Sequence, residues 1–209
     1  MDETGLWARI SLWGTEARSA VTKLIGQTPG SGEWSEQRSI RAFRGRWSAE
    51  ENFELMVPVV RAAGLGMELR AMGGCEADIA SAERERIISG IPSVPADIGL
   101  NDLPNEGGLD EVAISYTKGC YLGQEVMARL KNLGQVRRRL HVLRGEGSSS
   151  VSGSSLFQGE KKVGELRSVA SDGGGFVAMA MLSLVNLTAT DPLSLTPTGP
   201  ATIHIVRRV

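Results

Sequence analysis

Near the middle of the chain the sequence reads Lys118-Gly119-Cys120-Tyr121-Leu122-Gly123-Gln124-Glu125. The glycines allow tight or left-handed backbone on either side of the cysteine. The neighbouring lysine and a helix beginning at Gly123 both favour the thiolate form of a thiol. An arbitrary cysteine is more often a small buried hydrophobe, but these neighbours indicate that Cys120, with Lys118 beside it, is a reactive or ligating group.

Before this run, strands and helices alternate. Alternating apolar residues predict strands over 7–13, 39–43 and 52–57, and residues 27–37 are typical of a surface loop. Apolar residues at helical spacing predict helices over 15–25, 58–72, 77–89 and 123–133. A capping-box pattern over 48–51 makes a helix the alternative to the third strand. We prefer the strand because a helix that crossed Pro58 would lose a hydrogen bond and clash with its preceding turn.

After Val136 the character of the sequence changes. Strand-like runs at 138–143, 163–170, 176–182 and 202–206 are separated by Gly/Ser-rich segments, and no helical pattern of useful length remains. The predicted fold class is therefore α+β, with an α+β domain over residues 1–138 and a small antiparallel β-barrel over residues 139–209. The junction over 135–140 has no proline and is strand-like, so we expect the barrel to pack on the preceding part.

The composition is that of an ordinary globular protein, with 41% apolar and 22% charged residues. The formal net charge of −1 argues against a general polyanion binder, so direct nucleic-acid binding is not expected. No apolar run is long enough to span a membrane, and the acidic N-terminus lacks the features of a secretory signal. Cys75 and Cys120 are far apart without metal-ligand spacing, which favours a reduced, cytoplasmic protein without a metal site.

Five motifs resemble those of one family. Residues 118–125 are similar to the signature of the YgfZ family of folate-binding proteins, which are relatives of the aminomethyltransferase (T-protein) of the glycine cleavage system. Residues 52–58 resemble the Gly-Tyr/Phe-Glu-Val-x-Val-Pro strand of these proteins. Residues 86–92 resemble their Arg-Ile-Glu-Ala-Gly-Ile-Pro helix end, 103–106 their Leu-Pro-x-Glu motif, and 163–168 the Val-Gly-x-x-Thr-Ser element of their barrel. The resemblance implies a partial aminomethyltransferase-type folate-binding domain followed by the barrel.

The resemblance also implies site residues. It places Glu54 and Arg86 toward a folate, and makes Glu106, Tyr121 and Gln124 further binding candidates for tetrahydrofolate. A carboxylate suits the N–H donors of a pterin ring, and an arginine suits an anionic tail or a buried carboxylate. Without the family, Glu54 would be interpreted as a solvated carboxylate on the polar face of its strand, and Arg86 as an arginine extending outward from the edge of an apolar helix stripe.

A basic cluster at 137–139, with Arg129, Lys131 and Arg144 nearby, has two interpretations. The slightly preferred one is an exposed barrel edge that charge protects from aggregation. The alternative is attraction of an anion, which could be a polyglutamate folate tail, a partner surface or a tRNA phosphate.

The function that the resemblance implies is that of a tetrahydrofolate-binding accessory protein in iron–sulfur cluster assembly or repair, which indirectly supports tRNA modification. Cys120 would be its working thiol, as a transient ligand or redox group, and folate and iron–sulfur proteins or assembly factors would be its partners. An aminomethyltransferase is the alternative, although T-proteins generally lack a cysteine at this place. A third is a truncated scaffold without a ligand, in which 118–125 only shapes a turn.

Members of the family carry roughly a hundred further residues before the part that this chain matches. The pterin-facing acid of T-proteins lies in that part and has no counterpart here. Each unmet hydrogen-bonding group of a buried ring costs about 1–3 kcal/mol. We therefore expect tetrahydrofolate to bind this chain weakly.

Overall fold

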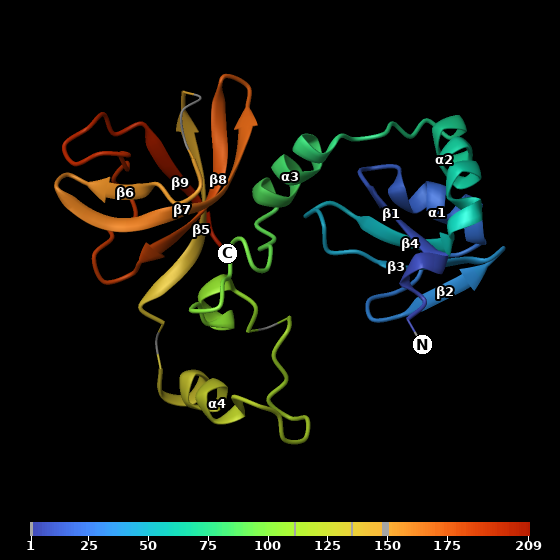
Figure 1. Cartoon of the computed structure of the whole chain (residues 1–209), viewed down its shortest axis with the longest axis horizontal. Coiled ribbons are helices and arrows are strands. Elements are labelled where there is room, and N and C mark those ends of the chain that lie inside the picture. The colour runs from blue at the N-terminus through green and yellow to red at the C-terminus, as the bar shows by residue number, and fades with distance from the viewer. Residues whose placement is uncertain (1, 111, 135, 148–150) are drawn as a thin grey trace. The chain divides into compact units, whose positions relative to one another are not determined.

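The computed structural model describes residues 2–110, 112–134, 136–147 and 151–209. The chain divides into two compact units, Met1–Ile91 and Pro92–Val209 (Figure 1). The domain boundary predicted between residues 138 and 139 thus lies inside the second unit. The first forty-odd residues of that unit make hydrogen bonds to the strands that follow them, as described below.

The first unit is a four-stranded antiparallel sheet with helices. Its strands have the order β1-β4-β3-β2. In chain order its elements are η1 (Thr4–Leu6), β1 (Trp7–Trp13), α1 (Ala17–Ile25), β2 (Trp34–Gln37), β3 (Ile40–Arg44), β4 (Asn52–Pro58), η2 (Val59–Arg61), α2 (Ala62–Ala71) and α3 (Ile79–Ile88). The strand predicted over 52–57 is confirmed as β4, which extends one residue further to Pro58, and no helix forms over 48–51. The loop predicted over 27–37 is wrong at its end, because β2 pairs there with β3.

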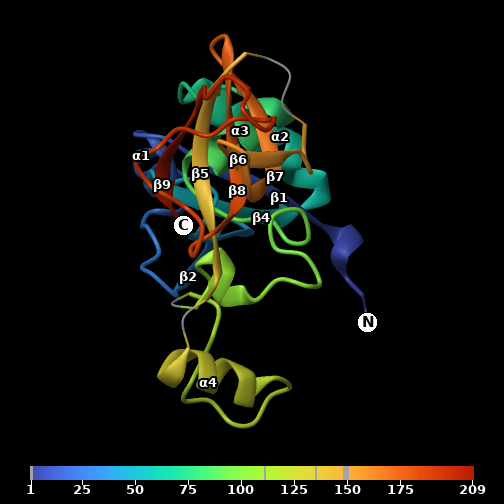
Figure 2. The same ribbon diagram turned by 90° about the vertical axis from the view of Figure 1, so that its left-hand side faces the viewer.

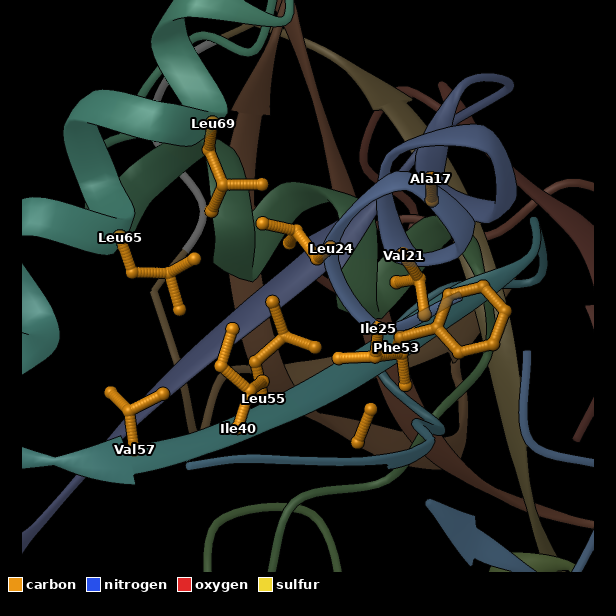
Figure 3. Close-up of a cluster of buried hydrophobic side chains, with 11 residues drawn as sticks. Ala17, Val21, Leu24, Ile25, Ile40, Phe53, Leu55, Val57, Leu65 and Leu69 are labelled. Atoms are coloured by element: carbon orange, nitrogen blue, oxygen red, sulfur yellow. The ribbon is translucent and has the colours of Figure 1, made fainter. Parts of the chain in front are cut away.

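Alternation along β4 builds the core of this unit. Phe53, Leu55 and Val57 are fully buried and point toward the apolar sides of α1 and α2 (Figure 3). The side chains that meet them from the helices include Val21, Leu24, Leu65 and Leu69. The opposite side of β4 carries Asn52, Glu54 and Met56, next to Arg9 and Ser11 of β1. One face of the sheet is therefore the hydrophobic core, and the other is polar.

The second unit is built on a five-stranded antiparallel sheet with the order β6-β7-β8-β5-β9. Its elements are η3 (Pro104–Gly107), α4 (Gln124–Leu133), β5 (Arg138–Glu146), β6 (Ser155–Gln158), β7 (Lys161–Asp172), β8 (Gly175–Ser183) and β9 (Ile203–Arg208). In both views α4 lies beyond the end of the sheet at which β5 begins (Figures 1 and 2). The predicted α+β class and antiparallel strands are confirmed.

Continuous strand pairing does not close this sheet into a barrel. Two isolated bridges instead connect its edges through one short segment. Leu193 pairs with Ile203 of β9, and Ser194 pairs with Phe157 of β6. Leu193 is fully buried and belongs to the core that Leu143, Leu156, Leu166 and Leu182 also form. The segment therefore curves the two edges toward each other around a single apolar core.

Candidate functional site

Cys120 lies on an exposed loop just before α4. Gly123, with φ of 85°, precedes the helix in the left-handed conformation that the sequence suggested for a glycine there. Cys120 is a free, exposed cysteine, and so is Cys75. Exposure therefore does not distinguish the two thiols, and only the chemical surroundings of Cys120 set it apart.

Lys118 and Tyr121 flank the thiol and contact each other. The Lys118 ammonium lies 4.8 Å from the centre of the Tyr121 ring, a cation–π arrangement. The Tyr121 hydroxyl is buried and has no hydrogen-bond partner in the described part of the chain. Gln124 begins α4, is half-buried, and donates its backbone N–H to the Tyr121 carbonyl at 3.2 Å. Four of the predicted site residues, Cys120 included, thus lie on this loop and at the first residue of α4, and Tyr121 retains an unsatisfied polar atom.

Glu54 is buried, so its interpretation as a solvated carboxylate is wrong. Only 7% of the residue is exposed. Its Oε2 accepts a hydrogen bond from Ser11 Oγ at 2.7 Å and lies 3.5 Å from Arg9 Nε. Both partners come from β1, where Ser11 is the register partner of Glu54. Glu54 Oε1 has no hydrogen-bond donor among the described residues, which leaves one free acceptor on this carboxylate.

Arg86 is 2% exposed and does not extend into solvent. Its Nε donates to Glu83 Oε2 at 2.9 Å, its Nη2 donates to the other oxygen, and its Nη1 donates to the Ile91 carbonyl. Gly90 is left-handed there, with φ of 66°, and Ile91 N–H donates to the Arg86 carbonyl at 3.1 Å. Arg86 therefore fixes the end of α3 and satisfies a carboxylate of the fold.

The apolar stripe predicted for this helix is only partly correct. Ile87 is fully buried, whereas Ile79 is 89% exposed because it is the first residue of α3. Asp78 accepts a hydrogen bond from Ser81 N–H at 2.7 Å and caps the helix at this point.

The Glu106 carboxylate also pairs with an arginine of the fold. Its Oε1 accepts from Arg138 Nε at 3.0 Å, and its Oε2 accepts from Arg138 Nη2 at 2.8 Å and from Leu103 N–H at 2.9 Å. The hydrogen bond to Glu106 raises the pKa of Arg138, against an opposing effect of burial. Glu106 therefore attaches η3 to β5, and neither of its oxygens is left for a ligand.

Asp102 extends this attachment and was not anticipated from the sequence. Its Oδ1 accepts from Arg138 Nη2 at 3.2 Å and from Arg167 Nη2 at 3.1 Å, and its Oδ2 accepts from Gly99 N–H at 2.8 Å. Only 4% of its side chain is exposed. Asp97, fully buried, accepts from Ser168 N–H at 3.1 Å. These acids hold residues 97–106 against β5 and β7.

The preferred interpretation of the basic cluster is wrong for Arg138 and Arg139. Arg139 donates to the Val209 carbonyl and to the Asn105 carbonyl, both at 2.8 Å. Arg144 pairs with Asp172 at 2.9 Å, and Arg129 with Glu125 at 3.3 Å. Of the three consecutive arginines, only Arg137 is exposed and has no side-chain partner in the described residues.

The candidate residues do not form one site within either unit. Glu54 and Arg86 belong to the first unit, and Glu106 and the loop of Cys120 to the second. Among the described residues, no group of three or more His, Cys, Asp or Glu side chains is placed to hold a metal ion. No helix in the same residues is long and apolar enough to cross a membrane. Among the residues predicted to bind folate, Glu54 and Tyr121 each retain a polar atom without a partner in the described residues, whereas Arg86 and Glu106 do not.

Comparison with known proteins shows what this chain is similar to. Residues 137–207 match the family described as the CAF17, C-terminal beta-barrel domain. The chain is 34% identical over 104 residues to the tRNA-modifying protein YgfZ of Colwellia psychrerythraea, a stretch that covers 46% of this chain and 32% of YgfZ. The predicted resemblance to the YgfZ family is confirmed. This chain therefore spans about a third of the length of YgfZ, and about a third of the length of the second relative described below.

A second relative of this YgfZ-like chain is the human mitochondrial iron–sulfur cluster assembly factor IBA57. The two are 32% identical over 117 residues, which cover 53% of this chain and 32% of IBA57. A crystal structure of the aminomethyltransferase T of the glycine cleavage system from Bartonella henselae is similar over 96% of this chain and 58% of its own, with a TM-score of 0.77 at 20% identity. That likeness shows that the YgfZ-like chain has the aminomethyltransferase fold.

Proposed function

We propose that this chain is an accessory protein in iron–sulfur cluster assembly or repair, through which it supports tRNA modification indirectly, and that Cys120 is its working thiol. The observation that carries the proposal is the exposed loop of Lys118, Cys120 and Tyr121 in a chain related to both YgfZ and IBA57. One relative is named for tRNA modification and the other for cluster assembly, and a thiol that takes part in cluster handling connects the two.

A cysteine thiolate donates a lone pair to iron, so Cys120 can act as a cluster ligand. Among the described residues, Cys120 belongs to no group of three or more His, Cys, Asp or Glu side chains that could hold a metal ion. Cys120 would therefore supply one ligand of a transient cluster, and a partner protein would supply the others. This arrangement suits a protein that passes on or repairs a cluster better than one that stores it.

The aminomethyltransferase alternative requires a tetrahydrofolate site. Two of the candidate residues are not available to such a site, because the Arg86 guanidinium pairs with Glu83 and the Glu106 carboxylate pairs with Arg138. Glu54 Oε1 and the Tyr121 hydroxyl remain as possible contacts. We infer weak tetrahydrofolate binding at most, and an accessory role in preference to a transferase.

Two experiments test the proposal. In bacterial cells that lack their own YgfZ-type protein, the expressed chain should restore the activity of an iron–sulfur tRNA-modifying enzyme. An unchanged, low activity with the chain present at normal abundance would refute the accessory role. Calorimetric titration with tetrahydrofolate tests the inference that this ligand binds weakly at most. Weak or undetectable heat is expected, and tight, saturable binding that Glu54→Gln abolishes would support the transferase instead.

A further inference from the structure

A cleft of about 1000 Å³ opens in the second unit, where α4 lies beyond the beginning of β5. Leu130 and Lys131 of α4 line it on one side. Arg137 just before β5, Leu184 after β8, and Arg208 at the end of β9 line it on another. None of the seven residues that the sequence singled out for cofactor or thiol chemistry is part of its lining. The cleft is thus separate from the Cys120 loop.

The cleft has an excess of positive charge. Four basic side chains line it, against the single carboxylate of Asp110. Arg139 lies 3.7 Å from Asp110, and Lys131 lies 4.1 Å from the centre of the Tyr116 ring. Arg137 and Arg208 have no acidic partner among the described residues. Two guanidinium groups are therefore available to an anionic ligand.

Two residues that line the cleft each carry a buried oxygen without a hydrogen-bond donor among the described residues. These oxygens are Asn105 Oδ1 and Asp110 Oδ1, and Asn105 as a residue is only 7% exposed. Arg139 Nη1 contacts both residues, at the carbonyl of Asn105 and near the carboxylate of Asp110. Both oxygens are covered by the protein itself, so the groups that a ligand in the cleft can reach are the exposed basic and apolar side chains of its lining.

The two available arginines are well separated. Arg208 is the register partner of His141, and Arg137 precedes His141 by four positions. At about 3.4 Å per residue the two backbone positions are about 14 Å apart along the direction of β5. Apolar side chains, Leu130, Leu184 and Val185 among them, line the rest of the cleft. A single small anion cannot use all of these features, whereas an extended chain can.

We propose that this cleft binds an acidic, partly apolar peptide segment of a partner protein. Two carboxylates of the segment would pair with Arg137 and Arg208, and its aliphatic side chains would contact Leu130 and Leu184. A peptide presents carboxylate and apolar side chains along one extended chain, which matches separated arginines with an apolar surface between them. This surface goes beyond the proposed function and does not depend on the thiol.

Fluorescence anisotropy with a labelled peptide, acetyl-ELDELE-amide, tests the proposal on the full chain. We expect saturable binding that weakens at least about tenfold in the double variant Arg137→Glu/Arg208→Glu, because like charges then face each other. The control variant Lys161→Glu/Lys162→Glu makes the same change of net charge on β7, outside the cleft lining, and should bind like the unchanged chain. Binding should also weaken as NaCl rises from about 0.05 to about 0.5 M.

No binding of the parent peptide, or equal losses in the two charge-reversal variants, would each overturn the proposal. Tighter binding of a short oligouridylate than of the peptide would overturn it in favour of RNA. A Cys120 variant that fails to restore the tRNA-modifying activity in cells but still binds the peptide would bear on the proposed function and not on this cleft.

Discussion

Arg138 makes a two-point contact with Glu106, from Nε to Oε1 at 3.0 Å and from Nη2 to Oε2 at 2.8 Å. The Glu106 side chain is 6% exposed and that of Arg138 is 41% exposed. This pair connects the segment before α4 to the first strand of the sheet. It explains why the second unit includes residues from Pro92 onward, and why Glu106 is structural in this chain.

We predict that Glu106→Ala and Arg138→Ala each lower the free energy of unfolding by about 1–3 kcal/mol, since each leaves a partner without its charged hydrogen bonds. Urea unfolding measures this, and the double variant should cost less than the sum of the two. Arg137→Ala, at an exposed side chain, serves as the control and should change the stability by less than about 0.5 kcal/mol. Full additivity of the two variants would show that the contact contributes no coupling.

Arg86→Ala should act on the end of α3. Because Arg86 satisfies Glu83 and the Ile91 carbonyl, its loss should destabilise the first unit by about 2–3 kcal/mol. Backbone amides over 87–91 should then exchange hydrogen faster. Arg129→Ala is the matched control, because Arg129 pairs only with Glu125 at the surface and should cost about 0.5 kcal/mol or less. Unchanged exchange in the Arg86 variant would contradict the structural role.

Limited proteolysis tests the junction before the sheet. Arg138 and Arg139 make hydrogen bonds to Glu106 and Asn105, so the backbone there should resist cleavage. Early cuts are expected in the exposed segment 73–78 between α2 and α3, and in the loop over 27–33. The Gly/Ser-rich loop over 148–155, another expected cleavage site, lies partly outside the described residues. Preferred cleavage between Gly134 and Leu140 would show that the junction is a flexible linker.

Histidine 141 should make stability depend on pH. Burial lowers the pKa of His141 below its usual 6.5; a hydrogen bond to the Arg139 carbonyl raises it, and the charges of Arg208 and Arg139 lower it. Unfolded chains then bind a proton that folded chains do not, so stability is fully present above about pH 6.5 and falls as the pH drops below it. The slope is at most about 1.4 kcal/mol per pH unit. His141→Gln should lose this slope between about pH 6.5 and 5, and parallel stability curves of the two proteins would rule the effect out.

Local sequence patterns predicted much of the fold. The strand over 52–57 and the strands β5, β7, β8 and β9 were recognisable because alternation and breakers act over a few residues, whereas β6 (Ser155–Gln158) was missed. Strand β2 was missed, since Trp34–Gln37 carries one apolar residue and is specified by its pairing with β3. The partners of Glu54 and of Glu106 were also missed. Ser11 lies 43 positions from Glu54, and Arg138 lies 32 positions from Glu106, so only the folded chain brings them together.

The site was predictable only in part, for the same reason. The Cys120 loop, a local motif, lies exposed before a glycine-initiated helix much as its sequence indicated. The folate candidates depended on the resemblance, and their availability depends on tertiary partners that no motif encodes. The arginines of 137–139 indicated a basic surface in the sequence. Arg208 and Asn105 lie beside them only because β9 pairs with β5 and because Arg139 makes a hydrogen bond to Asn105.

The most direct measurement compares Cys120→Ser with Cys75→Ser in cells that lack their own YgfZ-type protein, at matched abundance of the variants. Both cysteines are exposed and free, so the two substitutions should be equally tolerated by the fold. The proposed role predicts that Cys75→Ser restores the iron–sulfur tRNA-modifying activity fully, whereas Cys120→Ser leaves it at the level of cells without the protein. Equal restoration by both variants would contradict the assignment of Cys120 as the working thiol.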